Sequence, residues 1–305
     1  MEKDTKELIV SIGAVAAVVC IIFGGLVAYS GMYPPFTVVN SGSMQHSEES
    51  QIGTIDAGDL MIVQSSDKSQ IVTYVEGSQS GYGKFGEYGD VVVYDHPDRK
   101  VNIIHRAMVE LELVSSDQFS QKWHIPSLKD YDNWEFRDLF GTDEKSLYWD
   151  SDECVLTIPA VSKFFEFTLT DVGYGHVDVS MPLWSLGEGQ EEGYHGYLTK
   201  GDNASTNRVF DQNGIVDGLV TDDMVVSTAQ VELPWLGCIK LMMNDNLSQN
   251  IPSNSLTNLI ITFVVIIIAV FALAYGVGYL WDHRKSAKND EKDENAYVRK
   301  SKQRK

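Results

Sequence analysis

Two hydroxyl side chains flank a glycine in the segment Ser41-Gly42-Ser43-Met44. Gly42 is expected to permit a backbone turn that a side chain would block, which would expose the Ser43 hydroxyl and its own N–H. A serine hydroxyl is a poor nucleophile until a neighbouring base takes its proton. By itself, such a Ser-Gly-Ser segment is far more often a plain turn than an active site.

Two later segments carry the groups that such a serine needs. His105-Arg106 follows the hydrophobic stretch 101–104, and histidine titrates near neutral pH. The segment 199–203 contains Asp202, and Asp211 follows nine residues later. A carboxylate beside His105 would orient the ring and stabilise its protonated form. Taken alone, His105 is typical of a surface histidine at a strand end, and Gly-Asp-Asn is typical of a polar turn.

Together and in this order, these segments resemble the signal peptidase I family, in its archaeal and endoplasmic-reticulum branch. In that family a transmembrane helix precedes S-G-S-M, a G-D-[ILV]-V-x-Y strand, H-R and K-G-D-N. The corresponding stretches here are 41–44, 89–94, 105–106 and 200–203, and 231–237 is similar to a late I-P-x-L-G strand of the family. The resemblance covers roughly residues 8–106 and 197–240.

The resemblance implies a role for each matched residue. Ser43 would be the nucleophile, and His105 would be the general base, where bacterial relatives use lysine. Asp211 would orient or charge-balance His105, and Asp202 would support the site structurally. The Ser41 hydroxyl and the Ser43 N–H would form the oxyanion hole, in which one donor is typically worth about 2.7–4 kcal/mol of the barrier.

The sequence departs from the family pattern at several places. Gln45-His46 stands where an acidic residue and proline usually follow the methionine, and His46 is a second candidate base beside Ser43. The gap between His105 and Asp202 is longer than usual in this branch. The step from Asp202 to the second aspartate is longer as well, so Asp211 has three competitors: Asp217, Asp222 and Asp223.

Two apolar stretches predict membrane anchors. Residues 8–29 and 256–281 contain 22 and 26 residues without a charge, and about 20 suffice for a helix to cross the hydrocarbon core. The tail 282–305 has nine Lys and Arg residues, so the positive-inside rule predicts that this tail is cytoplasmic. We therefore expect a two-pass protein of the cell membrane whose middle segment faces outward.

The middle segment is strongly acidic. Residues 34–255 hold 35 acidic and 13 basic residues, a formal charge near −22. Because nucleic-acid phosphates need Lys and Arg partners, this composition argues against nucleic acid as a partner. The three cysteines form no zinc-binding pattern with histidine, and no cofactor or metal is expected. A Cys154–Cys238 disulfide is possible on the outer face.

The outer segment is expected to be mainly β, because β-branched runs alternate with Gly, Pro and Asp. Strands are predicted at 36–39, 59–63, 90–94, 101–104, 166–169, 177–179, 197–199, 223–226 and 231–239, and a flexible loop at 64–88. Four of the six tryptophans, at positions 123, 134, 149 and 184, mark a folded insertion.

The resemblance implies a signal-peptidase-like (LexA-like) β catalytic domain with a β-rich insertion, flanked by two transmembrane helices. The expected parts are an N-terminal stub and transmembrane helix (1–33), a catalytic domain (34–107 plus 194–247), an insertion (108–193), a second transmembrane helix (256–281) and a basic tail (282–305).

The expected function is that of a membrane-bound serine endopeptidase, a signal peptidase I that removes signal peptides from exported preproteins after small residues. Its expected partners are those signal peptides, membrane lipid and the protein-export channel. The alternative is a non-catalytic, membrane-anchored binding protein on an inherited peptidase scaffold. The inserted segment and Gln45-His46 favour that alternative, and the presence of all three reactive side chains favours the enzyme.

Overall fold

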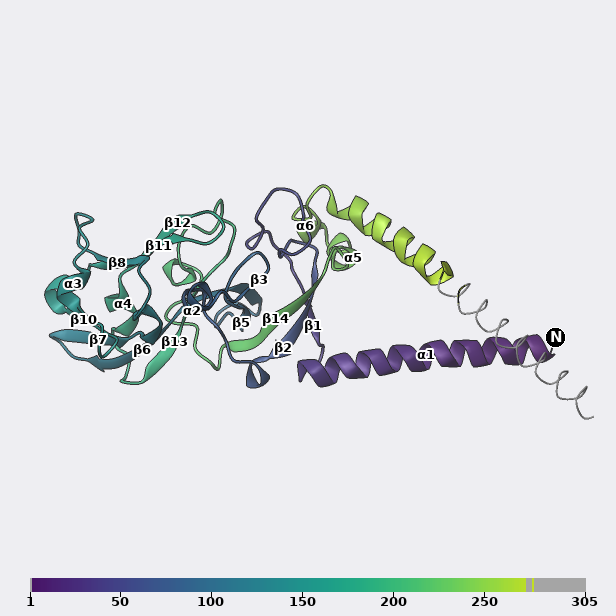
Figure 1. Ribbon diagram of the computed structural model, residues 1–305, viewed down its shortest axis with the longest axis horizontal. Coiled ribbons are helices and arrows are strands. Elements are labelled where there is room, and N and C mark those ends of the chain that lie inside the picture. Colours follow the sequence, from purple (N-terminus) through teal and green to yellow (C-terminus); the bar gives the residue numbers. More distant parts are fainter. Residues whose placement is uncertain (1, 273–275, 277–305) are drawn as a thin grey trace, which may run out of the picture. The chain divides into compact units, whose positions relative to one another are not determined.

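The computed structural model describes residues 2–272 and 276, and the chain divides into two units, Met1–Ser255 and Leu256–Lys305. The first unit begins with a long helix and is otherwise mainly antiparallel β structure (Figure 1). This agrees with the fold class expected from the alternation of β-branched runs and turn residues.

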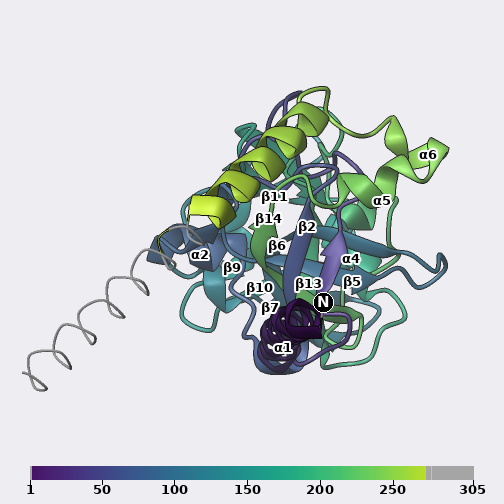
Figure 2. The ribbon, with the colours of Figure 1, turned by 90° about the vertical axis from the view of Figure 1, so that its right-hand side faces the viewer.

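One large sheet organises the first unit. Its strands are paired antiparallel in the order β1 (Phe36–Val38), β2 (Leu60–Ser65), β14 (Val225–Leu233), β5 (Val91–Asp95), β6 (Asn102–Ser116), β7 (Ser120–His124), β10 (Val155–Pro159) and β9 (Trp149–Asp150). The ninth strand, β13 (Tyr194–Lys200), pairs with β6 off this path. Figure 2 views the unit along the N-terminal helix, with β1 beside β2.

Smaller elements complete the unit. A three-stranded sheet has the order β12 (Val177–Met181), β11 (Glu166–Val172) and β8 (Trp134–Arg137), and β3 (Gly83–Lys84) pairs with β4 (Glu87–Tyr88). The short helices are α2 (Tyr74–Ser80), α3 (Lys145–Tyr148), α4 (Leu183–Gly187), α5 (Cys238–Met242) and α6 (Asp245–Ser248). Single 3-10 turns are η1 (Ser66–Lys68), η2 (Pro126–Leu128), η3 (Ala160–Ser162) and η4 (Asp211–Asn213).

Strand β6 connects the two parts that the sequence predicted. Its first half pairs with β5, and its second half pairs with β7 and β13. The expected boundary between residues 107 and 108 lies inside β6, and the expected boundary at 193/194 lies at the start of β13. The inserted residues therefore extend the large sheet through β7, β10 and β9, and they add the three-stranded sheet as well.

Two hydrophobic clusters matter for the site. The larger one fills the inserted part and includes the fully buried Trp123 and the nearly buried Trp134. The second lies under β1, β2 and β5 and includes Val39, Met44 and Met61, each at most 1% exposed. Because burial of such side chains is the dominant favourable contribution to folding, the second cluster holds the segment that follows β1 in place.

Two local predictions were wrong. Residues 64–88, expected to form a flexible loop, include α2 and the β3–β4 hairpin. Helix α2 begins with a capping box, in which Thr73 Oγ1 accepts the Glu76 N–H and Glu76 accepts the Thr73 N–H, and these bonds satisfy donors at the helix start.

The strand expected over 231–239 ends at Leu233, and α5 begins at Cys238. Pro234 has no N–H to continue the strand pairing. Trp235 has a positive φ of 63° and donates its N–H to Asp59 Oδ1 at 2.8 Å. The chain therefore turns away from the sheet after Leu233. The strand predicted over 223–226 is the start of β14 and is continuous with 231–233, so two predicted strands form one. The stretch 101–104 is likewise the start of the longer β6, and the remaining predicted strands are present with ends that differ by a few residues.

Helix α1 (Glu2–Ser30) opens the first unit and exposes many apolar side chains, among them Val18, Ile21 and Ile22. The helix Ser255–Ala272, which belongs to the second unit from Leu256 onward, is long and apolar enough to cross a membrane, with 18 residues of mean hydropathy 2.6. The apolar stretch described within α1, Val15–Ser30, is shorter than that length. The basic tail 282–305 lies outside the described residues. Cys154 and Cys238 are free and buried.

Candidate active site

The segment after β1 presents Ser43 in a tight reverse turn. The Gly42 carbonyl accepts the Gln45 N–H at 3.2 Å, which places Ser43 and Met44 at the middle of the turn. The Met44 side chain is 0% exposed and packs in the second hydrophobic cluster. The buried Met44 side chain therefore anchors the turn to the hydrophobic core, and the neighbouring Ser43 is half-buried.

The glycine before Ser43 has a different role from the one expected. Gly42 is not among the residues with positive φ, so the backbone itself does not demand glycine there. A Cβ at this position would lie 1.9 Å from Gln45 Oε1, so Gly42 makes room for that side chain. Gly201 is the more demanding position, because a Cβ there would lie 2.5 Å from the Ser43 carbonyl oxygen.

Asn203 holds the same turn from the other side. Its backbone N–H donates to the Ser43 carbonyl at 2.9 Å, and its Nδ2 donates to the Gly42 carbonyl at 2.7 Å. Within the described residues, the Ser43 N–H donates to no partner, and the Ser41 and Ser43 hydroxyls lie 3.3 Å apart. The Ser43 N–H is thus free to donate to an oxyanion beside Ser43, and the Ser41 hydroxyl lies close enough to be a second donor.

His105 and Asp211 form a buried pair. His105 lies on β6 opposite Val92 of β5, and it is 3% exposed. Its Nδ1 lies 2.7 Å from Oδ2 of Asp211, which begins η4 and is 1% exposed. The same carboxylate oxygen accepts hydrogen bonds from Thr199 Oγ1 at 2.6 Å and from the Tyr94 hydroxyl at 2.8 Å.

The electrostatics of Asp211 favour its charged form. Burial alone would raise the pKa of this carboxyl, but the His105 ring and the hydrogen bonds from His105, Thr199 and Tyr94 outweigh burial and lower the pKa below its ordinary value. The three competing aspartates are exposed, and none of them bonds to His105: Asp217, Asp222 and Asp223. The structure therefore brings Asp211 to His105.

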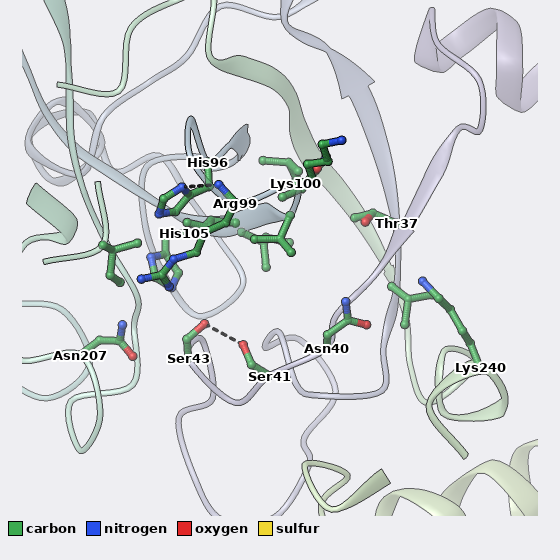
Figure 3. Close-up of a pocket in the computed structure, with 17 residues that line it drawn as sticks. Thr37, Asn40, Ser41, Ser43, His96, Arg99, Lys100, His105, Asn207 and Lys240 are labelled. Carbon is green, nitrogen blue, oxygen red and sulfur yellow. Dashed lines mark hydrogen bonds between the residues drawn. The ribbon is translucent and has the colours of Figure 1, made fainter. Parts of the chain in front are cut away.

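Ser41, Ser43 and His105 line one open pocket of about 530 Å³, which Figure 3 shows from close by. Ser43 and His105 are not hydrogen-bonded to each other in the part of the chain that the structure describes, and the Ser43 hydroxyl lies 3.3 Å from that of Ser41. Catalytic hydrogen bonds are often long in ligand-free enzymes and tighten when substrate binds.

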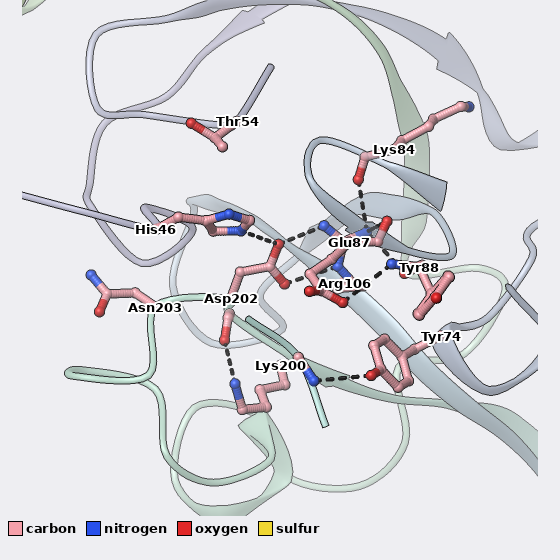
Figure 4. A network of polar contacts seen from close by, with 12 residues as sticks. His46, Thr54, Tyr74, Lys84, Glu87, Tyr88, Arg106, Lys200, Asp202 and Asn203 are labelled. Atoms are coloured by element: carbon pink, nitrogen blue, oxygen red, sulfur yellow. Dashed lines mark hydrogen bonds and ion pairs between the residues drawn. The ribbon is translucent and has the colours of Figure 1, made fainter. Parts of the chain in front are cut away.

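Asp202 lies in a separate polar network behind the turn (Figure 4). Its carboxylate forms a two-pronged ion pair with Arg106, with Nε 2.9 Å from Oδ1. Arg106 also donates to four backbone carbonyls of the β3–β4 segment, those of Lys84, Glu87, Tyr88 and Gly89. Burial opposes the charge of Asp202, but Arg106 outweighs it and holds the pKa far below the usual range. Asp202 and Arg106 thus join the turn after β13 to the β3–β4 hairpin.

His46 points into this second network. Its Nε2 lies 3.4 Å from Asp202 Oδ2, and its ring stacks on Tyr174 with 4.4 Å between ring centroids and 11° between planes. His46 does not line the pocket of Ser43 and His105. Tyr174 lies in the turn between β11 and β12, so the inserted part of the chain contacts this second network through His46. No sequence signal pointed to Tyr174, because its contact is set by the fold.

No cluster of three or more metal-ligating side chains occurs in the part of the chain that was searched, the described residues. No model of a known protein family matches the chain. A comparison with curated proteins likewise found no match.

Proposed function

We propose that the chain is a membrane-anchored serine endopeptidase that removes signal peptides from exported preproteins after small residues. The observation that carries this proposal is the shared pocket of Ser43 and His105, with the buried Asp211 carboxylate 2.7 Å from His105 Nδ1. Nucleophile, base and carboxylate in this order form the arrangement that activates a serine for acyl transfer.

The geometry suggests how the groups act. Asp211 accepts a hydrogen bond from the Nδ1–H of His105, so the proton stays on Nδ1 and the ring presents Nε2 as the base. When substrate enters, the Ser43 hydroxyl leaves Ser41, gives its proton to Nε2 and attacks the scissile carbonyl carbon. The Ser43 N–H and the released Ser41 hydroxyl then donate to the oxyanion. His105 returns the proton to the leaving amine, and water, activated by the same base, releases the acyl group from Ser43.

Two unpaired strand edges beside the pocket favour a peptide substrate. Among the described residues, β1 pairs with β2 alone, and residues 102–105 of β6 pair with β5 alone because the pairing of β13 begins at Arg106. Residues from both edges line the pocket, including Thr37, Val38, Ile103 and Ile104. An extended peptide can add its backbone hydrogen bonds to such an edge.

The membrane anchors fit a substrate that itself emerges from a membrane. Helix Ser255–Ala272 is long enough to cross, and the exposed apolar residues of α1 are suited to lipid. Ser43 follows the last residue of α1 by 13 positions, which keeps it near the surface where a signal peptide leaves the bilayer. We propose two crossings, a cytoplasmic basic tail, an outward catalytic domain and a place beside the export channel.

The test is a cleavage assay in membranes with a preprotein whose signal peptide ends in Ala-x-Ala. Ser43→Ala and His105→Ala are expected to abolish cleavage while membrane insertion is unchanged, and Gln45→Ala and His46→Ala to reduce it modestly. His105→Lys is expected to stay inactive, because a lysine base needs a drier pocket that lowers its pKa. Ser185→Ala and His176→Ala, at exposed positions away from the pocket, are the matched controls.

Cleavage that survives Ser43→Ala would remove the proposed nucleophile. Wild-type protein that binds the preprotein without cutting it would instead identify a binding protein on a peptidase scaffold.

A further inference from the structure

Three basic side chains surround the pocket of Ser43 and His105. Arg99 and Lys100 belong to the exposed loop between β5 and β6, and Lys240 belongs to α5 (Figure 3). About 140 residues separate the loop from α5 in the sequence. The fold therefore gathers these three cations, here called the basic rim, around one opening.

The basic rim stands out against the charge of the rest of the outer segment. Residues 34–255 carry 35 acidic and 13 basic residues, yet no Asp or Glu is among the residues that line this pocket. Two other pockets of the unit are lined by several acidic residues each: Glu87, Asp132 and Asp171 in one, and Asp67, Glu76, Glu110 and Asp222 in the other. Among the described residues, the Lys, Arg, Asp and Glu side chains that line the proposed active site are thus all basic, although the outer segment as a whole is acidic.

The charges of the rim are not neutralised within the protein. In the described part of the chain, Arg99, Lys100 and Lys240 form no ion pair, whereas Arg106 and Arg137 are paired with carboxylates. Unpaired cations grouped beside a concave site attract an anionic ligand.

His96 adds a hydrogen-bond donor to the same wall. It lines the pocket and is 7% exposed, and its Nδ1 accepts the N–H groups of Asp98 and Arg99 at 3.0 and 3.1 Å. These bonds hold the loop that carries Arg99 and Lys100. Because Nδ1 is an acceptor, the neutral ring carries its proton on Nε2, and this buried nitrogen has no partner among the described residues. A buried donor without an acceptor is unfavourable, and a ligand oxygen would satisfy it.

We propose that the basic rim and His96 form a specificity subsite that selects substrates with an acidic residue close to the cleaved bond. This inference rests on the proposed peptidase function. The occupant is the substrate chain because the rim residues line the same pocket as Ser43 and the two unpaired strand edges. A lipid headgroup would need no connection to those edges.

The length of β6 sets the expected position of the acidic residue. Strand β6 begins at Asn102, three residues before His105, and extended backbone rises about 3.3 Å per residue, so the loop that carries Arg99 and Lys100 begins roughly 10 Å along the strand from His105. A substrate strand along this edge has the same rise. Because the long basic side chains can reach back toward Ser43, the acidic residue is expected about three to five positions from the cleaved bond, on one side of it.

The experiment uses the full chain in detergent and a series of peptides that contain Ala-x-Ala. A single Asp is placed in turn at each position from five before to five after the cleaved bond, and each peptide is compared with its Asn counterpart. The expected ratio of kcat/KM for Asp over Asn is about five- to tenfold at positions three to five on one side. The ratio is expected to fall toward one in 0.5 M salt, because salt screens exposed charges.

Variants assign the effect to the rim. Combining Arg99→Gln, Lys100→Gln and Lys240→Gln is expected to bring the Asp/Asn ratio close to one. The charge-matched control combines Lys122→Gln, Lys129→Gln and Lys163→Gln, which are exposed positions outside the pocket, and is expected to keep the ratio. Lys100→Glu is expected to favour a peptide with Lys at the selected position, a gain that misfolding cannot produce.

The outcomes separate this inference from the function on which it rests. If wild-type protein cuts the Asn peptides but shows no Asp preference at any position, the subsite is wrong and the peptidase stands. If none of the peptides is cut by wild-type protein, the proposed function fails first. A third outcome is that phosphatidylglycerol vesicles stimulate cleavage of the Asp and Asn peptides equally, and that the rim variants lose only this stimulation. The rim would then bind lipid headgroups, and the inference would be overturned.

Discussion

Asp211→Asn changes the charge of the carboxylate beside His105 and keeps the size of the side chain. In the native site, Oδ2 of Asp211 accepts hydrogen bonds from His105 Nδ1 at 2.7 Å, Thr199 Oγ1 at 2.6 Å and the Tyr94 hydroxyl at 2.8 Å. If the asparagine NH₂ group faces His105, Nδ1 must become an acceptor and the ring proton moves to Nε2. The ring then has no free nitrogen with which to take the proton of Ser43.

The expected loss of activity follows from this change of tautomer. In the serine protease triad, the same exchange lowers kcat by about 10⁴-fold, which corresponds to about 5.5 kcal/mol at 1.36 kcal/mol per decade. We expect a loss of 10³- to 10⁴-fold here. An unchanged KM would indicate that binding along the strand edges is retained.

The same substitution is expected to cost stability. Three hydrogen bonds to a buried charge, each worth about 1.5–3 kcal/mol, become bonds to a neutral group worth about 0.5–1.5 kcal/mol. The expected loss is therefore about 3–4.5 kcal/mol in the free energy of unfolding at neutral pH. Because the pKa of Asp211 is lowered in the folded state, this contribution is fully present above the unfolded pKa of about 3.9 and is lost as the pH falls through the folded pKa. The difference between wild type and variant is thus expected to shrink in acid.

The assay measures kcat/KM on a preprotein together with unfolding of the detergent-solubilised chain. Asp223→Asn is the matched control, because Asp223 is exposed and bonds to Thr221, away from His105. Activity of Asp211→Asn within tenfold of wild type would refute the assignment of Asp211 as the partner of His105. An equal loss in Asp223→Asn would refute it as well.

Two further predictions concern the support of the site. Asn203→Ala is expected to lower kcat about tenfold or more with little change in KM, because the Gly42 carbonyl loses its side-chain donor while the backbone bond to the Ser43 carbonyl remains; an unaltered kcat, or an equal loss in the control Asn213→Ala, would contradict this. Burial raises the pKa of Asp59 from its ordinary value of 3.8 to about 8. Between these two pH values the folded chain holds a proton that the unfolded chain has lost, so the melting temperature is expected to decline as the pH rises from about 4 to 8. In Asp59→Asn, this decline in melting temperatures between pH 5 and 9 is expected to be shallower, and an identical slope would count against the shifted pKa.

Local sequence patterns were sufficient for most of the strands and for the apolar helices. A strand needs only alternating or continuous β-branched residues between turn residues, and these are visible within five to eight neighbouring positions. The strands that contain residues 36–38, 60–63 and 91–94 and the turn at Ser43 were predicted in this way and are present. The capping box that starts α2 was also visible in Thr73 and Glu76, but the glycines around it suggested a loop.

The partners of the site residues were decided by the tertiary structure alone. Nothing local distinguishes Asp211 from Asp217 or Asp223, and the choice follows from the way β13 and η4 bring Asp211 beneath β6, 106 residues from His105. The direction of His46 depends on contacts with Asp202 and Tyr174, which lie more than 120 residues away. The basic rim likewise exists only because α5 packs near the β5–β6 loop. Hydrophobic patterning specifies which side of a segment is buried, whereas the identity of each polar partner depends on strand order and register, which a single segment does not contain.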